Sequence, residues 1–293
     1  MKSVRISVPA SSGNLGSGFD VLAAALDLRN SLEVALDGKG AFSIDGEGAA
    51  ALPRGAGNLA VRILARHLPK RKFSVRMNNA IPLGRGLGSS GAARLAAHAA
   101  GLALSGKDPA GALALAAADE GHPDNVAASA RGGLTAVVGT EPLDIYRVAM
   151  PRDLKAVVCV PAFQLSTQVA REALPEEVPL QDAVFNLSRA LAWPAAILEK
   201  RYGRLRAATE DALHQPYRRA LVPGLREVIA VALEAGALGA CLSGAGPTVL
   251  AVCGAKSNLE DVGRAMAGAF RLKGVQSTFR ILDFDNRGMR VER

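Results

Sequence analysis

The segment Ile81-Pro82-Leu83-Gly84-Arg85-Gly86-Leu87-Gly88-Ser89-Ser90-Gly91 joins a glycine-rich turn to the expected start of a helix. Three glycines alternate with other residues, two serines follow, and an Ala/Leu-rich run begins at Ala92. Glycine lets backbone N–H groups approach a ligand, and a helix N-terminus adds free donors and partial positive charge. The segment therefore predicts a phosphate-binding loop, with Ser89 and Ser90 placed to contact phosphate oxygens or a metal ion. It is not a Walker A loop, because no lysine precedes the serines. The structural alternative is a glycine-rich turn capped by serine before an ordinary helix.

The composition is that of a folded protein of about two domains. The chain has 293 residues, of which 49% are hydrophobic and only 4% aromatic, so we expect a core of Ala, Val, Leu and Ile. We find neither a run of 18 apolar residues nor a secretory signal, and we expect no membrane partner. The three cysteines, Cys159, Cys241 and Cys253, stand singly in apolar surroundings. Their spacing suggests neither a disulfide framework nor a metal site, which fits a cytoplasmic protein.

The formal net charge of +8 raises the question of nucleic-acid binding. The basic residues are scattered, however, and their longest cluster is Lys70-Arg71-Lys72. Aromatic residues do not interleave with them, so base stacking has little to work with. We therefore expect no nucleic-acid partner and favour a basic surface that attracts anionic small molecules.

Strands and helices alternate irregularly along the chain. Alternating or apolar runs predict strands over residues 2–9, 30–37, 41–46, 73–77, 134–138, 155–160, 248–253 and 275–283, with one more between Pro142 and Pro151. Helical spacing is found over residues 57–68, 89–104, 109–120, 167–173, 180–201, 204–213, 224–235 and 257–272. Several connections are too short for parallel crossovers, which favours an α+β fold with mixed or antiparallel sheets packed by helices. We expect a domain boundary near residue 150, giving an N-terminal domain of residues 1–150 and a C-terminal domain of residues 151–293.

Two polar clusters lie in the first half. The segment 9–20 follows a strand and carries Asn14 and Asp20 among small residues, so it can hydrogen-bond a polar substrate or simply form a turn. The segment Glu120-Gly121-His122-Pro123-Asp124-Asn125 places a carboxylate at a helix end, where it can hold Mg²⁺, while His122 can donate to an anion. The alternative is a helix ended by Gly121 and Pro123, with Asp124 capping the next helix.

Two further clusters lie in the second half. Thr167 and Arg171 share one helix face at a spacing of four residues, and Arg218 and Arg219 follow Pro216-Tyr217. The planar arginine fork matches a carboxylate or a phosphate, although a single arginine of this kind commonly forms a surface ion pair. The segment 243–248 places glycines between two apolar runs, which suggests close approach to a ligand or a plain hairpin loop.

These clusters, in this order, resemble the motifs of the GHMP kinases, a family of small-molecule kinases. The resemblance covers the strand and loop around Asn14, the segment 82–91 and the segment 244–248, and so extends over essentially the whole chain. Within the family the chain is most similar to the homoserine kinases, through Pro9-Ala10-Ser11-Ser12, Gly121-His122-Pro123-Asp124-Asn125 and Pro216-Tyr217-Arg218. The resemblance implies a two-domain fold with the active site in the cleft between the domains. It also implies ATP and Mg²⁺ as cofactors, L-homoserine as substrate and a homodimer.

The resemblance further implies a role for individual residues. The ATP phosphates are expected on Pro82, Leu83, Gly84, Arg85, Gly86, Leu87, Gly88, Ser89, Ser90 and Gly91, and the adenine near Asn58. Mg²⁺ is expected on Ser90 and Glu120, with Asp119 as the adjacent alternative. L-Homoserine is expected to contact Asn14, Asp20, His122, Arg171 and Arg218. The catalytic positions are Asn125, Thr167 and Arg171.

The substrate's chemistry fits these residues. A carboxylate suits an arginine fork, and Arg171 and Arg218 can supply two, while the ammonium suits the carboxylate of Asp20. Some members of the family carry an aspartate base where this chain has Asn125, and an amide takes no proton at neutral pH. We therefore expect no dedicated base, and the hydroxyl proton leaves late, to a phosphate oxygen; Asp124 is the alternative base. Other readings of the chain are a GHMP kinase for another alcohol, such as mevalonate, and a nucleotide-binding protein without catalysis.

Overall fold

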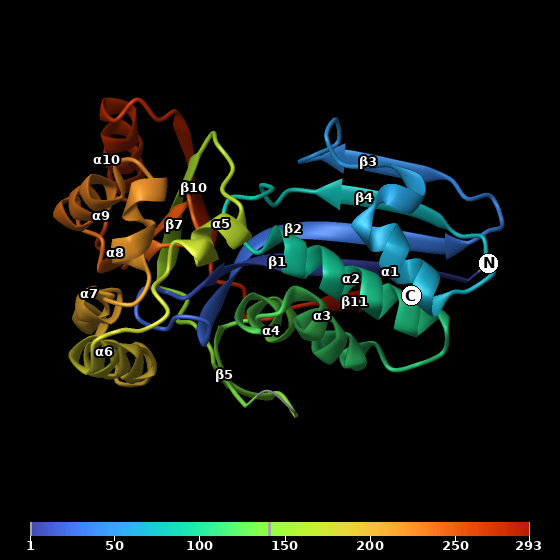
Figure 1. Cartoon of the computed structure of the whole chain (residues 1–293), viewed down its shortest axis with the longest axis horizontal. Coiled ribbons are helices and arrows are strands. Elements are labelled where there is room, and N and C mark those ends of the chain that lie inside the picture. Colours follow the sequence, from blue (N-terminus) through green and yellow to red (C-terminus); the bar gives the residue numbers. More distant parts are fainter. Residues whose placement is uncertain (1, 140–141, 293) are drawn as a thin grey trace.

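The computed structural model describes residues 2–139 and 142–292, which build two sheets with helices packed against them (Figure 1). The first sheet contains β1 (Lys2–Gly13), β2 (Leu22–Leu36), β3 (Phe42–Gly46), β4 (Ser74–Asn79), β5 (Leu134–Val138), β6 (Asp144–Val148) and β11 (Arg290–Glu292). Its main path runs in the order β11-β1-β2-β4-β3, and β5 pairs with β2 and β6. Strands β3 and β4 are parallel, and the other pairs are antiparallel.

The second sheet is antiparallel and has the order β10-β7-β9-β8. It contains β7 (Lys155–Pro161), β8 (Gly239–Leu242), β9 (Val249–Cys253) and β10 (Ser277–Asp283). Helices α9 (Leu225–Glu234) and α10 (Leu259–Leu272) pack on it. After β10 the chain returns to the first half, where β11 pairs with β1. The division of the chain at residue 150 stays a prediction.

The remaining helices fall into two groups, one in each half of the chain (Figure 1). The first group contains α1 (Leu59–His67), α2 (Ser89–Leu104), α3 (Ala112–Glu120) and α4 (Asp124–Arg131). The second contains α5 (Thr167–Glu172), α6 (Leu180–Leu198), α7 (Leu205–Ala208) and α8 (Gln215–Arg218). Short 3-10 turns lie at Gly55–Gly57, Pro109–Gly111, Tyr202–Arg204 and Arg219–Leu221.

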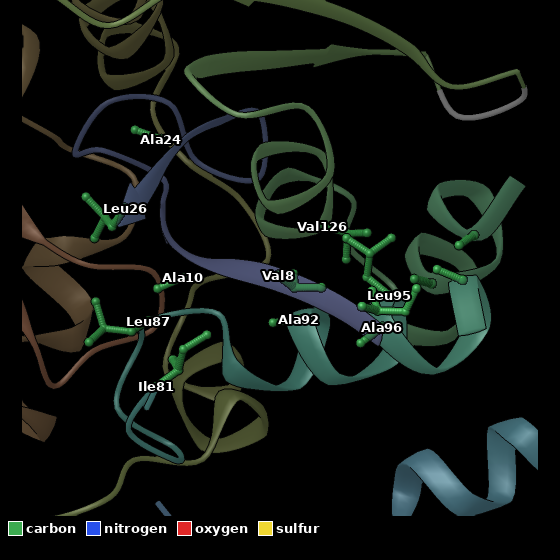
Figure 2. Close-up of a cluster of buried hydrophobic side chains, with 14 of the residues drawn as sticks. Val8, Ala10, Ala24, Leu26, Ile81, Leu87, Ala92, Leu95, Ala96 and Val126 are labelled. Carbon is green, nitrogen blue, oxygen red and sulfur yellow. The ribbon is translucent and has the colours of Figure 1, made fainter. Parts of the chain in front are cut away.

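Helix α2 is the central helix of the first half, and its position fixes the phosphate loop. Leu95 and the small residues Ala92 and Ala96 are buried, in the cluster to which Val8 of β1 belongs (Figure 2). Small side chains let a helix approach a sheet closely, so the helix start is held at a defined place beside the end of β1. Leu87 of the preceding loop is also fully buried in this cluster and anchors the loop from below.

The structure confirms the α+β class with mixed and antiparallel sheets. The predicted helix over residues 89–104 and the predicted strand over residues 134–138 coincide with α2 and β5. The helix predicted over residues 204–213 is wrong beyond Ala208, because the carboxylate of Asp211 accepts hydrogen bonds from the backbone of Leu213, His214 and Gln215 and holds a turn there. The first half of β2 was not predicted, since its residues 22–26 are buried on both faces and show no alternation.

Candidate active site

The predicted phosphate loop is a backbone turn that only glycine can form easily. Gly84, Gly86 and Gly88 have φ values of +61°, +77° and +71°, in the left-handed region. Gly88 directly precedes Ser89, the first residue of α2, so the loop ends at free backbone N–H groups of a 16-residue helix. A Cβ atom on Gly86 would overlap the carbonyl oxygen of Ser243. The glycine at this position is therefore required by both backbone conformation and packing.

Three segments far apart in the sequence meet at this loop. Ser243 Oγ donates to the Gly86 carbonyl at 2.7 Å and lies 2.8 Å from Ser12 Oγ. The backbone N–H of Ser11 donates to the Leu87 carbonyl at 3.2 Å, and that of Gly244 donates to the Gly13 carbonyl at 3.0 Å. The end of β1, the phosphate loop and the segment 243–248 thus form one hydrogen-bonded unit.

A cavity of about 90 Å³ lies where the two halves meet. Its walls combine the phosphate loop with side chains from both halves of the chain: Ser89, Ser90, Glu120, His122, Asn125, Leu165, Thr167 and Ala245. The cavity therefore brings the start of a helix, a carboxylate, an imidazole, an amide and three hydroxyl groups to one place. Its size suits a phosphoryl group and the end of an acceptor rather than a whole nucleotide.

A second, more apolar cavity of about 520 Å³ shares Gly84, Ser89 and Ser90 with the first. Leu52, Pro53, Leu59, Met77 and Leu83 supply apolar surface, and Asn58 lies on its wall. The amide of Asn58 is already engaged, because Oδ1 accepts from the backbone of Ala60 at 2.9 Å and Nδ2 donates to the Pro53 carbonyl at 3.0 Å. This side chain caps α1 and shapes the cavity, and each of its polar atoms keeps one further hydrogen-bonding position, so its contact to the adenine stays a prediction.

Ser90 and Glu120 converge as expected for a metal site. Ser90 Oγ donates to Glu120 Oε2 at 2.9 Å, and Arg94, one turn further along α2, forms an ion pair with the same carboxylate. Within residues 2–139 and 142–292, no three His, Cys, Asp or Glu side chains gather as a metal cluster. A hydroxyl and one carboxylate at a phosphate loop nevertheless fit Mg²⁺, which binds oxygen ligands and commonly takes the rest of its shell from substrate phosphates and water.

Asp119 does not share this position. Its carboxylate accepts from Arg66 Nη2 at 2.6 Å and lies 3.1 Å from His98 Nε2. Asp119 therefore belongs to a separate contact between α1, α2 and α3. Of the two carboxylates, only Glu120 contacts Ser90 and lines the cavity.

His122, Asp124 and Asn125 form a short chain below the cavity. His122 Nδ1 lies 3.1 Å from Asp124 Oδ1, and Asn125 Nδ2 donates to Asp124 Oδ2 at 3.3 Å. The hydrogen bond to Asp124 raises the pKa of His122, which favours an imidazolium at the cavity wall. Asp124 itself is buried and is not part of that wall, whereas His122 and Asn125 are.

Asp20 and Arg171 bind each other. Arg171 Nη1 and Nη2 donate to Asp20 Oδ2 and Oδ1 at 2.9 and 3.0 Å. Arg171 stands one turn after Thr167 on α5, and Thr167 lines the cavity. Both Asp20 and Arg171 keep about a third of their side chains exposed. The pair is therefore accessible beside the cavity.

Arg218 is only 2% exposed, and most of its guanidinium forms hydrogen bonds within the protein. Its Nε donates to the Ala170 carbonyl at 3.0 Å, and its Nη1 lies 3.2 Å from His214 Nδ1 and 3.3 Å from the Gly244 carbonyl. Burial lowers its pKa to about 10, so it stays a cation at neutral pH. Arg218 thus joins α5, α8 and the segment 243–248. The sequence had predicted instead an arginine whose guanidinium is available to bind the carboxylate of the substrate.

Asn14 holds the loop on the other side. Its Nδ2 donates to the Gly244 carbonyl at 2.9 Å, and its Oδ1 accepts from the backbone of Asp20 at 3.0 Å. Asn14 and Asp20 have φ values of +64° and +55°, which non-glycine residues rarely adopt. The side-chain amide of Asn14 therefore fixes a strained loop that carries Asp20.

The structure brings most of the predicted residues together, but sequence reasoning missed two. Arg94 pairs with Glu120, and His214 contacts Arg218 and stacks on Phe19 with ring centroids 5.5 Å apart. Each lies four residues from a predicted site residue on a helical segment, Ser90 or Arg218. This spacing places both residues on the same helix face and could have pointed to them.

Comparison with known proteins agrees with this geometry. The family models for the GHMP kinases N-terminal domain and the GHMP kinases C-terminal match residues 52–133 and 195–272. The homoserine kinase of Moorella thermoacetica is 43% identical over 97% of this chain and 98% of its own length. That of Thermus thermophilus is 46% identical over 85% of this chain and 86% of its own. The crystal structure of homoserine kinase from Cytophaga hutchinsonii superposes with a TM-score of 0.88 at 28% identity, covering 100% of this chain and 98% of that one.

A phosphate loop at a helix start, closed by the two flanking segments, defines a small-molecule kinase site, and the chain belongs to the GHMP kinase family. Within that family, the two relatives that are 43% and 46% identical to it over most of its length are homoserine kinases. Mevalonate kinase shares the fold at a TM-score of 0.67 but only 13% identity.

Proposed function

We propose that this chain is a homoserine kinase, which transfers the γ-phosphoryl group of ATP to the hydroxyl of L-homoserine and yields O-phospho-L-homoserine and ADP in threonine biosynthesis. The observation that carries this proposal is the exposed Asp20–Arg171 pair beside a phosphate loop. A substrate with one carboxylate and one ammonium group can bind both partners of such a pair. The names of the relatives support the same substrate.

In the proposed complex the nucleoside occupies the apolar cavity and the triphosphate lies on the backbone N–H groups of the loop and α2. The homoserine carboxylate binds Arg171 and the ammonium binds Asp20, which directs the hydroxyl toward Thr167 and Asn125. His122, whose pKa is raised by its hydrogen bond to Asp124, lies at the cavity wall, where its ring can donate a hydrogen bond to a phosphate oxygen. Such positioning and charge stabilisation supply most of the catalysis in phosphoryl transfer.

Ser90 and Glu120 would hold Mg²⁺, which neutralises charge on the phosphates when bound. Arg94 also pairs with Glu120 and holds that carboxylate at the cavity. Asn125 cannot accept the hydroxyl proton, and Asp124 lies behind the wall. We therefore infer that the proton leaves late in the reaction, to a phosphate oxygen.

The test is ADP release by the purified protein with L-homoserine, mevalonate and galactose as acceptors. We expect Mg²⁺-dependent turnover with L-homoserine alone. Turnover only with mevalonate or galactose would replace the substrate, and ATP binding without turnover on any acceptor would indicate a non-catalytic nucleotide-binding protein.

We also propose a cytoplasmic homodimer with no nucleic-acid or membrane partner. Among the helices of residues 2–139 and 142–292, none is long and apolar enough to cross a bilayer. The scattered basic residues support small anionic ligands rather than a polynucleotide.

A further inference from the structure

Helix α6 carries a row of large apolar side chains on its outer surface. Leu180, Val184, Leu187, Leu191 and Leu198 are 80%, 55%, 66%, 71% and 69% exposed. Pro194 continues the row between the last two. Monomeric proteins rarely leave a contiguous apolar patch of this extent in water.

The spacing of these residues is that of a helix–helix contact. The steps from 180 through 184, 187, 191 and 194 to 198 are four, three, four, three and four residues, the pattern of a coiled-coil seam. The opposite face of α6 is already used, because Asn186, Trp193, Ala196 and Ile197 are buried against the protein. Helix α6 lies at the periphery of the second half, so the seam faces outward (Figure 1).

We propose that this seam, defined by residues 180, 184, 187, 191, 194 and 198, packs against the same seam of a second copy of this chain in antiparallel orientation. The seam would be the contact surface of the homodimer proposed above, so this inference rests on the proposed homodimer. The step pattern is the same in both directions about residue 189. A two-fold axis there places 180 opposite 198, 184 opposite 194, and 187 opposite 191, so apolar residues meet throughout.

The charges at the two ends of α6 select the antiparallel orientation. Glu176 and Glu177 precede the helix, and Glu199, Lys200 and Arg201 follow it; all five are exposed. Glu199 lies 3.7 Å from Arg201, and the two cations leave this end with a net positive charge. An antiparallel pair brings each acidic end beside the basic end of the other copy. A parallel pair would place like charges together. At the midpoint, Arg189 points away from the seam, pairs with Glu210 at 2.9 Å and stacks on Phe185, so it puts no like charges on the axis.

The seam also has a suitable length and symmetry. Its helix has 19 residues, which corresponds to a contact of about 28 Å. An isologous contact of this kind closes on itself and forms a dimer rather than a fibre. Ala183, Ala190 and Ala195 flank the seam and leave room for close approach of the two helices.

The experiment compares the wild-type chain with L187E/L191E, which places charges at the centre of the seam, by sedimentation velocity at about 20 µM, a concentration at which a micromolar dimer is populated. Leu272→Glu is the matched control, because Leu272 is 87% exposed on α10, outside the seam. We expect a dimer for the wild type and the control, and a monomer with an unchanged circular dichroism spectrum for L187E/L191E.

The orientation is tested by charge exchange. Glu177→Lys and Arg201→Glu are each expected to raise the dimer dissociation constant by about threefold to tenfold, and the double variant is expected to restore it. A wild-type monomer, or a dimer that L187E/L191E leaves intact, would overturn the proposed surface. Failure of the double variant to recover would overturn the antiparallel register. Kinase activity is measured separately, so loss of the dimer with turnover retained leaves the proposed activity standing.

Discussion

The guanidinium of Arg171 and the carboxylate of Asp20 form a two-bond pair, at 2.9 and 3.0 Å, between residues 151 positions apart in the sequence. An α-amino acid also carries one carboxylate and one ammonium group. Its carboxylate can replace Asp20 at Arg171, and its ammonium can replace Arg171 at Asp20. Because both side chains are partly exposed, opening the pair costs about 1 kcal/mol or less. The pair can therefore open at little cost to bind the carboxylate and ammonium groups of the proposed acceptor.

Arg171→Lys retains the positive charge but loses the planar fork. We expect the KM for L-homoserine to rise by about tenfold or more, with the KM for ATP changed by about twofold or less, since in the proposed complex Arg171 contacts only the acceptor. Arg189→Lys, on the surface pair with Glu210, serves as the control and should behave as wild type. Equal increases in both KM values would contradict the assignment of Arg171 to the acceptor.

Glu120→Gln removes the charge of the proposed metal ligand while keeping its shape. We expect kcat to fall by about 100-fold and the Mg²⁺ concentration for half-maximal rate to rise. Asp119→Asn is the matched neighbour, and because Asp119 faces Arg66 and His98 it should change kcat by only about twofold. The opposite ranking in a Mg²⁺ titration would transfer the metal to Asp119.

Gly86→Ala tests the close approach of the phosphate loop to Ser243. Gly86 and Gly106 have similar φ values, +77° and +81°, but only at Gly86 would a Cβ atom meet a neighbouring backbone. Both alanine variants carry the backbone strain of about 1 kcal/mol or more. Gly86→Ala should in addition weaken ATP binding by about tenfold or more, as measured by titration calorimetry. Equal ATP affinity in the two variants would mean that the loop tolerates displacement.

His214 should make the protein less stable in acid. Its Nε2 lies 2.8 Å from the Gly16 carbonyl and its Nδ1 faces Arg218, so the buried ring has no place for a second proton. Burial lowers the pKa of His214 below the unfolded value of about 6.5, and stability is therefore lost as pH falls below about 6.5, by up to about 1.4 kcal/mol per pH unit.

Urea unfolding of the wild type and of His214→Gln at pH 7.5, 6.5 and 5.5 measures this loss. The variant should lose less stability toward pH 5.5, because the contribution of His214 is gone. Some decrease should remain in both proteins, since burial also lowers the pKa values of His67 and His98. His122 acts in the opposite direction, since its raised pKa gives a stabilisation that is lost as pH rises through the folded value. Identical pH profiles for wild type and variant would exclude His214 as the source.

Arg218→Ala should affect folding as well as binding. Removing this buried side chain leaves the carbonyl of Ala170 without this donor, which costs about 1–3 kcal/mol, whereas the carbonyl of Gly244 keeps its hydrogen bond from Asn14. We expect a lower melting temperature together with a higher KM for L-homoserine. An unchanged melting temperature with only the KM raised would show that Arg218 acts as a free substrate ligand.

Short sequence patterns predicted those helices and strands whose boundaries are set by neighbouring residues. Helix α2 and the loop before it follow from glycines, a serine start and alanine-rich spacing, and β5 follows from a bounded apolar run. The buried half of β2 has no alternation, and the turn after Ala208 depends on one carboxylate, Asp211, that caps the following backbone. Neither the composition nor the periodicity of the sequence predicts the buried half of β2 or the turn at Asp211.

The predicted site residues lie close together in the structure, but the contacts that they make were less predictable. Residue type and the family motifs identified Asp20, Arg171 and Glu120, but their partners depend on how distant segments meet. Thus Asp20 faces Arg171, Glu120 faces Arg94, and Arg218 is enclosed by backbone carbonyls of α5 and of the segment 243–248. Such pairings require the tertiary structure.

The phosphate loop is bonded to both halves at once, through Ser11 on one side and Ser243 and Leu165 on the other. Leu165 donates its backbone N–H to the Gly84 carbonyl at 2.9 Å. A hinge motion that separates the two halves would therefore break the hydrogen bonds that hold the phosphate loop. We expect substrates to enter and products to leave through small movements of side chains at the rim, while the scaffold remains closed throughout each turnover.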